Sequence, residues 1–204
     1  MVGESIAGPG VSGFSDSGSG VVGESSSGPA LVASGATGNL VEGYVGGITF
    51  SNRRFHITND GTYVAGSDFA EALPASGNRA AYEPGDVLVV STKAPGKVEK
   101  ASRPYDPRVA GIYSTRPGML GADKNGTSRV DKDDVPVAIV GIVPTKVSAM
   151  NGSIRVGDLL TTSSTPGYAM RCTNRVKCVG AIVGKALEPL TGGRGVIKVL
   201  VMLR

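Results

Sequence analysis

The short segment Gly66-Ser67-Asp68-Phe69-Ala70-Glu71 carries the residue types best suited to covalent chemistry in this chain. Ser67 offers a hydroxyl group, and Asp68 and Glu71 place two carboxyl groups three residues apart. Such a set could supply a nucleophile, or a water molecule with a general base beside it. A serine followed by an aspartate before a bend is also a common turn or capping pair. The residues alone leave the catalytic and the structural interpretation open.

Two other patterns could carry chemistry, and each has a plainer interpretation. His56, the single histidine, alternates with Phe55 and Ile57, so a structural histidine is favoured over a pH-sensitive contact or a general base. The stretch from Asp123 to Asp134 has the span of a calcium loop, but its glycine is misplaced and the closing bidentate glutamate is missing. We expect neither a metal site nor a cofactor.

Cys172 and Cys178 lie six residues apart in a stretch that reads as a hairpin. They could form a disulfide or remain as two half-buried thiols, and the thiol interpretation is favoured. With one histidine in the chain, a zinc site is not expected.

The elements that must position these residues begin with a ten-residue repeat over residues 1–47. Glycine and serine recur in fixed columns, and one column is apolar throughout: Val11, Val21, Leu31 and Val41. Each unit offers too little apolar surface to bury alone, so the segment must stack on itself or on other chains. We therefore predict a fibre stem in which three intertwined chains bury this column as a homotrimer core. Disorder in the isolated chain is the rival interpretation.

The remainder of the chain reads as an all-β head. Six runs rich in β-branched residues are bounded by glycine or proline: 87–91, 109–113, 137–143, 159–162, 179–183 and 196–203. Gly85-Asp86-Val87-Leu88 is echoed by Gly157-Asp158-Leu159-Leu160, and Val109 to Ile112 by Val179 to Ile182. This duplication predicts a β-barrel or β-sandwich with approximate two-fold internal symmetry, in which each Gly-Asp pair forms a turn.

These patterns divide the chain into four parts. We expect a short trimeric stem, β-helical or triple-stranded, over residues 1–47, and a β-hairpin neck over 48–66. A strap or linker is expected over 67–82, and the all-β head over 83–204. The four repeat units look like the last part of a longer stem.

Charge is distributed unevenly between stem and head. The stem holds four acidic residues and no Lys or Arg, which leaves 21 basic against 13 acidic residues for the rest. Because the basic residues are scattered and not interleaved with aromatics, we expect no nucleic-acid partner. No stretch has the length and apolar character of a membrane span or a secretion signal, so no membrane insertion is expected.

The order of these elements resembles a known family. A Gly/Ser-rich repeat, a Phe-x-Ile-x-x-x-Gly hairpin, the Gly-Ser-Asp-Phe-Ala-Glu segment, Gly-Asp turns and a closing Val-Ile-Lys-Val-Leu-Val strand follow one another. Residues 48–204 are similar to the C-terminal region of phage tail-fibre and appendage proteins, which ends in an autoproteolytic intramolecular-chaperone domain. The resemblance implies that the head brings three chains into register. It also implies that scission, where retained, falls between Ser67 and Asp68, with Asp68 and Glu71 as the acid and base.

The leading expectation is a structural fibre component whose head trimerises, sets the register of the stem and caps the fibre. The alternatives are a receptor- or glycan-binding tip, and a self-cleaving peptidase. The expected partners are two further copies of the chain, with a cell-surface glycan or an upstream fibre or baseplate protein in addition. The expected location is a virion or an extracellular fibre that assembles in the cytoplasm.

Overall fold

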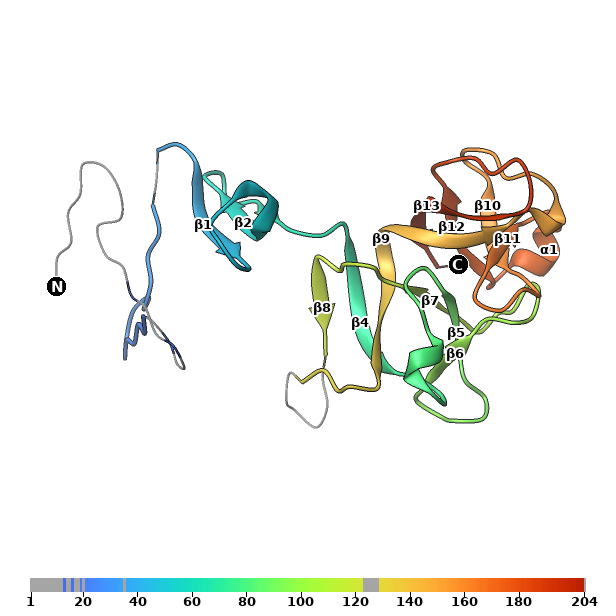
Figure 1. The fold of residues 1–204 in the computed structure, drawn as a ribbon, viewed down its shortest axis with the longest axis horizontal. Coiled ribbons are helices and arrows are strands. Elements are labelled where there is room, and N and C mark those ends of the chain that lie inside the picture. The colour runs from blue at the N-terminus through green and yellow to red at the C-terminus, as the bar shows by residue number, and fades with distance from the viewer. Residues whose placement is uncertain are drawn as a thin grey trace.

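A computed structural model of the chain describes residues 13, 16, 19, 21–34, 36–122 and 129–203. Strands hold 42% of the residues and helices 7%, which confirms the predicted all-β fold. A small three-stranded sheet lies apart from the head, to which it is joined by one chain segment (Figure 1). The strands are β1 (Asn39–Tyr44), β2 (Arg53–Thr58), β3 (Tyr63–Val64), β4 (Asp68–Pro74), β5 (Val87–Val90), β6 (Val98–Lys100), β7 (Val109–Tyr113), β8 (Met119–Gly121), β9 (Asp134–Ser148), β10 (Leu159–Thr162), β11 (Ala169–Arg171), β12 (Ile182–Ala186) and β13 (Arg194–Met202). The helices are the short 3-10 turns η1 (Phe50–Asn52), η2 (Arg79–Ala81) and η3 (Ala149–Asn151), and the single-turn α1 (Arg175–Cys178).

The small sheet, in the order β1-β2-β3, forms the neck. Gly61, at φ +85°, supports the turn between β2 and β3, as the sequence predicted. The sheet also reaches back into the repeat, because β1 belongs to the last repeat unit and pairs with β2. Gly43 on β1 is needed there, since a Cβ would overlap the Phe55 ring. Hydrogen bonds from Tyr44, then Asn39 and Arg53, lower the pKa of Glu42 to about 2.

The second half of the head is a closed five-stranded barrel. Its strands follow the order β11-β10-β12-β13-β9, and the barrel closes where β11 runs parallel to β9. In that closing pair Ala169 lies opposite Val147. The first half has the same plan, with β6-β5-β7-β9-β4, but a single parallel bridge between Ala75 and Val98 closes it.

Strand β9 is shared by the two barrels and joins them. Its first half pairs with β4 and β7, and its second half pairs with β13 and β11. Figure 1 shows this long strand running from one half of the head into the other. A shared strand of 15 residues makes the two halves one continuous sheet system.

The two barrels have similar strand arrangements and similar turns, as the repeated Gly-Asp pairs predicted. Gly85 and Gly157 both have φ +88°. Asp86, Asp158 and also Asp134 each accept a 2.8 Å hydrogen bond from the main-chain N–H three residues earlier. The turn at Asp134, at the start of β9, is a third example, and the search for repeated Gly-Asp pairs did not find it because no glycine precedes Asp134.

One detail of the expected duplication is wrong. The structure equates Val109 with Ile182, not with Val179, because Leu88 pairs with Gly111 in the first barrel and Leu160 pairs with Gly184 in the second. The connection before β12 contains α1 and is longer than its counterpart before β7, which displaces β12 along the sequence.

Each barrel has its own apolar interior. The larger cluster fills the second barrel and extends under β5 and β7, and the smaller one lies beneath β4 and β6. Both are built from small aliphatic side chains such as Val143, Val183 and Val135, all fully buried. Burial of alternate residues along each strand provides the main stabilisation of this fold.

The two barrels meet at a hairpin tip of the second. Gly167, in the turn between β10 and β11, accepts a hydrogen bond from Val87 N–H and donates one to the Ala101 carbonyl, both at 2.8 Å. Next to it, the fully buried Asp86 carboxylate pairs with Lys100 at 2.9 Å and Lys146 at 2.8 Å. The junction therefore combines main-chain bonds with a buried charge that has two cationic partners.

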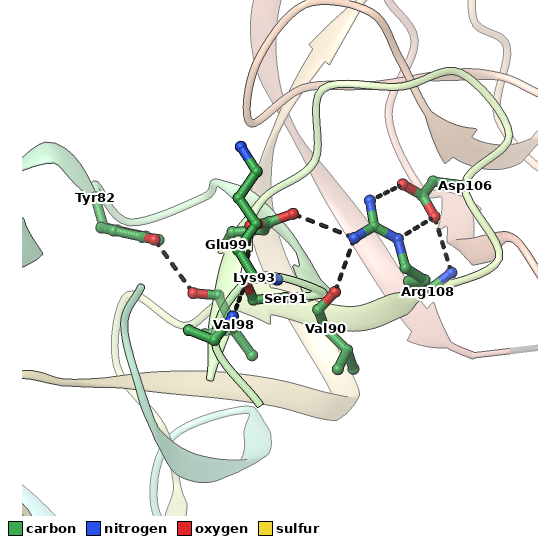
Figure 2. Close-up of polar contacts among 9 residues, drawn as sticks. Tyr82, Val90, Ser91, Lys93, Val98, Glu99, Asp106 and Arg108 are labelled. Carbon is green, nitrogen blue, oxygen red and sulfur yellow. Dashed lines mark hydrogen bonds and ion pairs between the residues drawn. The ribbon is translucent and has the colours of Figure 1, made fainter. Parts of the chain in front are cut away.

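A polar network holds the loop that leads from β6 to β7 (Figure 2). The Arg108 guanidinium donates to both oxygens of Asp106, at 3.0 and 2.6 Å, and also reaches the Val90 carbonyl and Glu99. Arg108 thereby keeps the pKa of Asp106 below its usual range. Asp106 N–H in turn donates to Thr162 Oγ1 at 2.7 Å, so this loop too is fixed to the second barrel.

Two expectations about local structure are wrong. The segment 67–82 is not a linker: it contains β4, whose pairing with β9 buries Ala70 and Ala72 in the head. Cys172 and Cys178 are not free thiols in a hairpin, because they form a disulfide across α1. The single helical turn brings the two cysteines together. The prediction of an extended hairpin did not include this turn.

Candidate functional site: the Ser67–Asp68 junction

The Ser67–Asp68 peptide lies where the neck enters the head. Asp68 is the first residue of β4 and pairs with Gly141 on β9. Main-chain bonds fix both carbonyl groups: Ile142 N–H donates to the Ser67 oxygen at 3.1 Å, and Gly118 N–H donates to the Asp68 oxygen at 2.8 Å. An N–H already directed at the Ser67 carbonyl would stabilise negative charge that develops there during hydrolysis.

Glycines allow neighbouring main chains to approach this peptide closely. Gly141 has φ +119°, and a Cβ there would lie 2.5 Å from Asp68 Cα. A Cβ on Gly66 would lie 2.5 Å from the Arg116 carbonyl oxygen, and one on Gly118 would overlap Gly66. Larger residues at these positions would force the strands apart, so this close packing requires glycine at all three.

The Asp68 carboxyl group is buried without full compensation. Its residue is 8% exposed, and this burial raises the pKa of Asp68 above its ordinary value. The nearby Ser114 hydroxyl opposes this rise in the pKa of Asp68. Among the described residues, neither Asp68 Oδ2 nor Ser114 Oγ has a hydrogen-bond partner. A carboxyl group in this setting is a proton donor closer to neutral pH than an exposed aspartate.

Glu71 does not join Asp68 in an acid/base pair within one chain. Side chains alternate along β4, so Asp68, Ala70 and Ala72 face the interior while Glu71 faces the other side. The Glu71 carboxylate lies over Gly121 on β8, where a Cβ would overlap it. Asp68 and Glu71 are close in sequence, but residues three apart on a β-strand point to opposite faces of the sheet.

Hollows open on both sides of the Ser67–Asp68 peptide. One, of about 310 Å³, is lined by Tyr63, Phe69 and Met119, and the other, also about 310 Å³, by Arg116 and Pro144. Ser67 itself is exposed. Water can therefore reach the peptide even though the Asp68 side chain is buried.

The residues predicted to form the trimer core differ in how far their own chain covers them. Val21 and Leu31 are 69% and 79% exposed in the single chain. Val41 lies on β1 opposite Ile57 and is half-buried within the chain. Val11 lies outside the described residues. Two members of the apolar column thus lack cover from their own chain.

The other candidates from the sequence lie elsewhere in the structure. His56 lies half-buried on β2, where it pairs with Glu42 and Val64. Among the described residues, His, Cys, Asp and Glu side chains form no group of three that could hold a metal ion. Residues 123–128 of the calcium-like stretch lie outside that part, and Asp134 forms the turn that begins β9.

Within the part of the chain that the structure describes, no helix has the length and apolar character needed to cross a bilayer.

Comparison with known proteins gives a weak likeness to one solved phage protein. No family model matches the chain, and no curated protein matches it. Among solved structures, the pre-mature bacteriophage phi29 gene product 12 aligns with a TM-score of 0.47 and 15% identity. The alignment covers 73% of this chain and 24% of that protein, so this chain spans about a quarter of its length. A likeness at this level does not establish a shared activity, assembly or partner.

Proposed function

We propose that this chain is a structural component of a trimeric phage tail fibre or appendage, in which the double barrel joins three chains and sets the register of the stem. The observation that carries the proposal is the exposure of the stem's apolar side chains beside a well-packed head. Val21, Val22, Leu31 and Val32 are all at least 67% exposed in one chain. Exposed aliphatic residues in a regular repeat favour burial between chains.

The head supplies what a repetitive stem lacks. Identical units can pair in several slipped registers of similar free energy, whereas a non-repetitive fold has one arrangement. The neck transmits that arrangement, because β1 begins inside the last repeat unit and is paired with β2. A head that associates first would fix the stem through this sheet.

A truncation tests this role. Residues 1–65, without the head, should show neither a trimer in sedimentation nor a cooperative thermal transition by circular dichroism, whereas the full chain should show both. A truncated chain that still forms a trimer and melts cooperatively would contradict the proposal.

Self-cleavage between Ser67 and Asp68 is a second candidate, favoured by the buried Asp68 Oδ2 that has no partner in the described structure. Water would add to the Ser67 carbonyl carbon, and the protonated Asp68 carboxyl would donate its proton to the departing main-chain nitrogen. Glu71 faces away, so a group other than Glu71 would have to accept the proton of the water.

Intact-mass measurement after long incubation tests this candidate, with Asp68→Ala as the matched control. Two fragments that meet between Ser67 and Asp68, absent in the variant, are expected. Recovery of the full-length mass alone, in trimer and in monomer, would reject cleavage and leave the structural role intact.

A further inference from the structure

Within the described residues, the internal duplication provides two similar hairpin tips and two similar docking sites, of which only one tip and one site contact each other. We define the first tip as residues 91–97, between β5 and β6, and the second tip as residues 163–168, between β10 and β11. Gly96 in the first tip and Gly167 in the second have φ +76° and +77°. Their closing main-chain bonds also correspond, from Lys97 N–H to Ala94 and from Tyr168 N–H to Thr165. The two tips therefore have closely similar backbones.

The second tip is already bound, and the first is free. Gly167 is buried against the first barrel, where it bonds Val87 and Ala101. Gly96 is exposed, and a Cβ placed on it would meet nothing within 4 Å. One copy of the motif is thus used for docking while the other projects from the surface.

The site that receives Gly167 also has a counterpart. Ala101 N–H donates to the Val87 carbonyl at 2.9 Å, and Cys172 N–H donates to the Leu159 carbonyl at 2.8 Å in the same position of the second barrel. In an extended strand the N–H and C=O of one residue point to the same side, so Leu159 N–H faces Cys172. In the described part of the chain, no turn or loop bonds to Leu159 N–H or to the Cys172 carbonyl as Gly167 bonds to Val87 and Ala101. These are the groups that Gly167 satisfies in the first barrel.

Apolar surface surrounds this open site. A hollow of about 370 Å³ lies beside it, lined by Leu159, Cys172, Val179 and Ile182. Val179 is 80% exposed and Val176, on α1, is 85% exposed. The Cys172–Cys178 disulfide fixes α1 at the edge of the hollow. Uncovered apolar side chains beside an exposed strand end are typical of a surface that another chain covers.

We infer that the first tip of one copy of this chain docks into the Leu159–Cys172 site of a second copy, repeating between chains the contact that Gly167 makes within one. The Gly96 carbonyl accepts from Leu159 N–H, and Gly96 N–H donates to the Cys172 carbonyl. Because tip and site are different surfaces, the contact is heterologous, and three such contacts can close a ring. The inference rests on the proposed three-chain association and adds the surface through which the heads join.

A photo-crosslinking amino acid in place of Lys97, in the full chain at micromolar concentration, tests this contact. Irradiation should give bands of two and three chain masses on a denaturing gel, with the adduct mapped by mass spectrometry to residues 172–182. A trimer whose adducts fall elsewhere would overturn this interface and leave the proposed function standing. A monomer without interchain adducts would overturn both.

A pair of glycine variants gives a second readout. Gly96→Leu should weaken association about tenfold or more, because a side chain at the tip would be forced between Leu159 and Cys172. Gly77→Leu is the matched control: Gly77 has φ +82°, is exposed, and also has nothing within 4 Å of a Cβ. Equal dissociation constants for the two variants, measured by sedimentation, would contradict the interface.

Discussion

Gly167 lies directly against Asp86, so that a Cβ on Gly167 would stand 2.5 Å from Asp86 Oδ1. The carboxylate is fully buried and held by two lysines, which leaves it little freedom to move aside. The contact joins the hairpin tip of one barrel to the first turn of the other. It gives the turn between β10 and β11 a second reason to contain glycine, besides the positive φ of Gly167.

Gly167→Ala should therefore lower the free energy of unfolding by about 3 kcal/mol, the sum of a strained positive φ and overpacking at the junction. Gly193→Ala is the control, because Gly193 has φ +69° but nothing within 4 Å of a Cβ. The control should cost only about 1 kcal/mol. Urea denaturation followed by circular dichroism, at one fixed protein concentration, measures both; equal losses would contradict the proposed clash.

Removing the carboxylate at the same junction should be more damaging. Asp86→Ala leaves Lys100 and Lys146 without their buried counter-charge and should cost about 3–5 kcal/mol. Asp158→Ala removes the corresponding turn bond in the second barrel, where no ion pair to Asp158 is found in the described structure, and should cost about 1 kcal/mol. Similar losses for the two variants would show that the lysines contribute little.

Asp68→Asn should stabilise the protein at neutral pH. Because the pKa of Asp68 is raised in the folded state, the folded protein binds this proton more tightly, and stability falls as pH rises through that pKa. The neutral amide avoids this loss, so the variant should gain about 1 kcal/mol at pH 7 and nothing in acid, where the native carboxyl is protonated.

Asp60→Asn provides a control for this experiment, because the pKa of Asp60 is shifted in the opposite direction to that of Asp68. Hydrogen bonds from Thr58 and then Thr62 lower the pKa of Asp60, so its ionised form favours folding and the amide should not gain at pH 7. Denaturation curves at a series of pH values distinguish the two cases. An Asp68→Asn variant no more stable than the native chain at pH 7 would contradict the buried-carboxyl account.

Reduction of the Cys172–Cys178 disulfide should destabilise the second barrel modestly. The bond closes a loop with a sequence separation of six, for which the loss of chain entropy in the unfolded state is worth about 2 kcal/mol. Denaturation with and without a thiol reductant measures this difference. A Cys172→Ser, Cys178→Ser double variant should match the reduced protein; unchanged stability in both would contradict the estimate.

Much of the head could be predicted from the sequence, because β-branched runs and Gly-Asp turns report directly on strands and their starts. β5, β7 and β10 lie where the residues predicted them. β4 was missed because Ala70, Ala72 and Pro74 have weak strand character, and its pairing with β9 decides its structure. Such long-range pairing leaves no local signal.

The sequence predicted where the candidate site lies, but not how its side chains are arranged. The Ser67–Asp68 segment was found from its residue types, yet only the strand geometry shows that Asp68 is buried and Glu71 faces away. The open site at Leu159 and Cys172 had no sequence signal, since it depends on the turn at Gly167, which docks onto the first barrel and has no such counterpart on the second in the described residues.

The mass of the intact chain in solution tests the central claim most directly. Sedimentation equilibrium of the native protein at micromolar concentration should give three times the 20.6 kDa chain mass, with no loading-concentration dependence well above the dissociation constant. A single species of 20.6 kDa that retains the folded head would contradict the proposed trimeric fibre role.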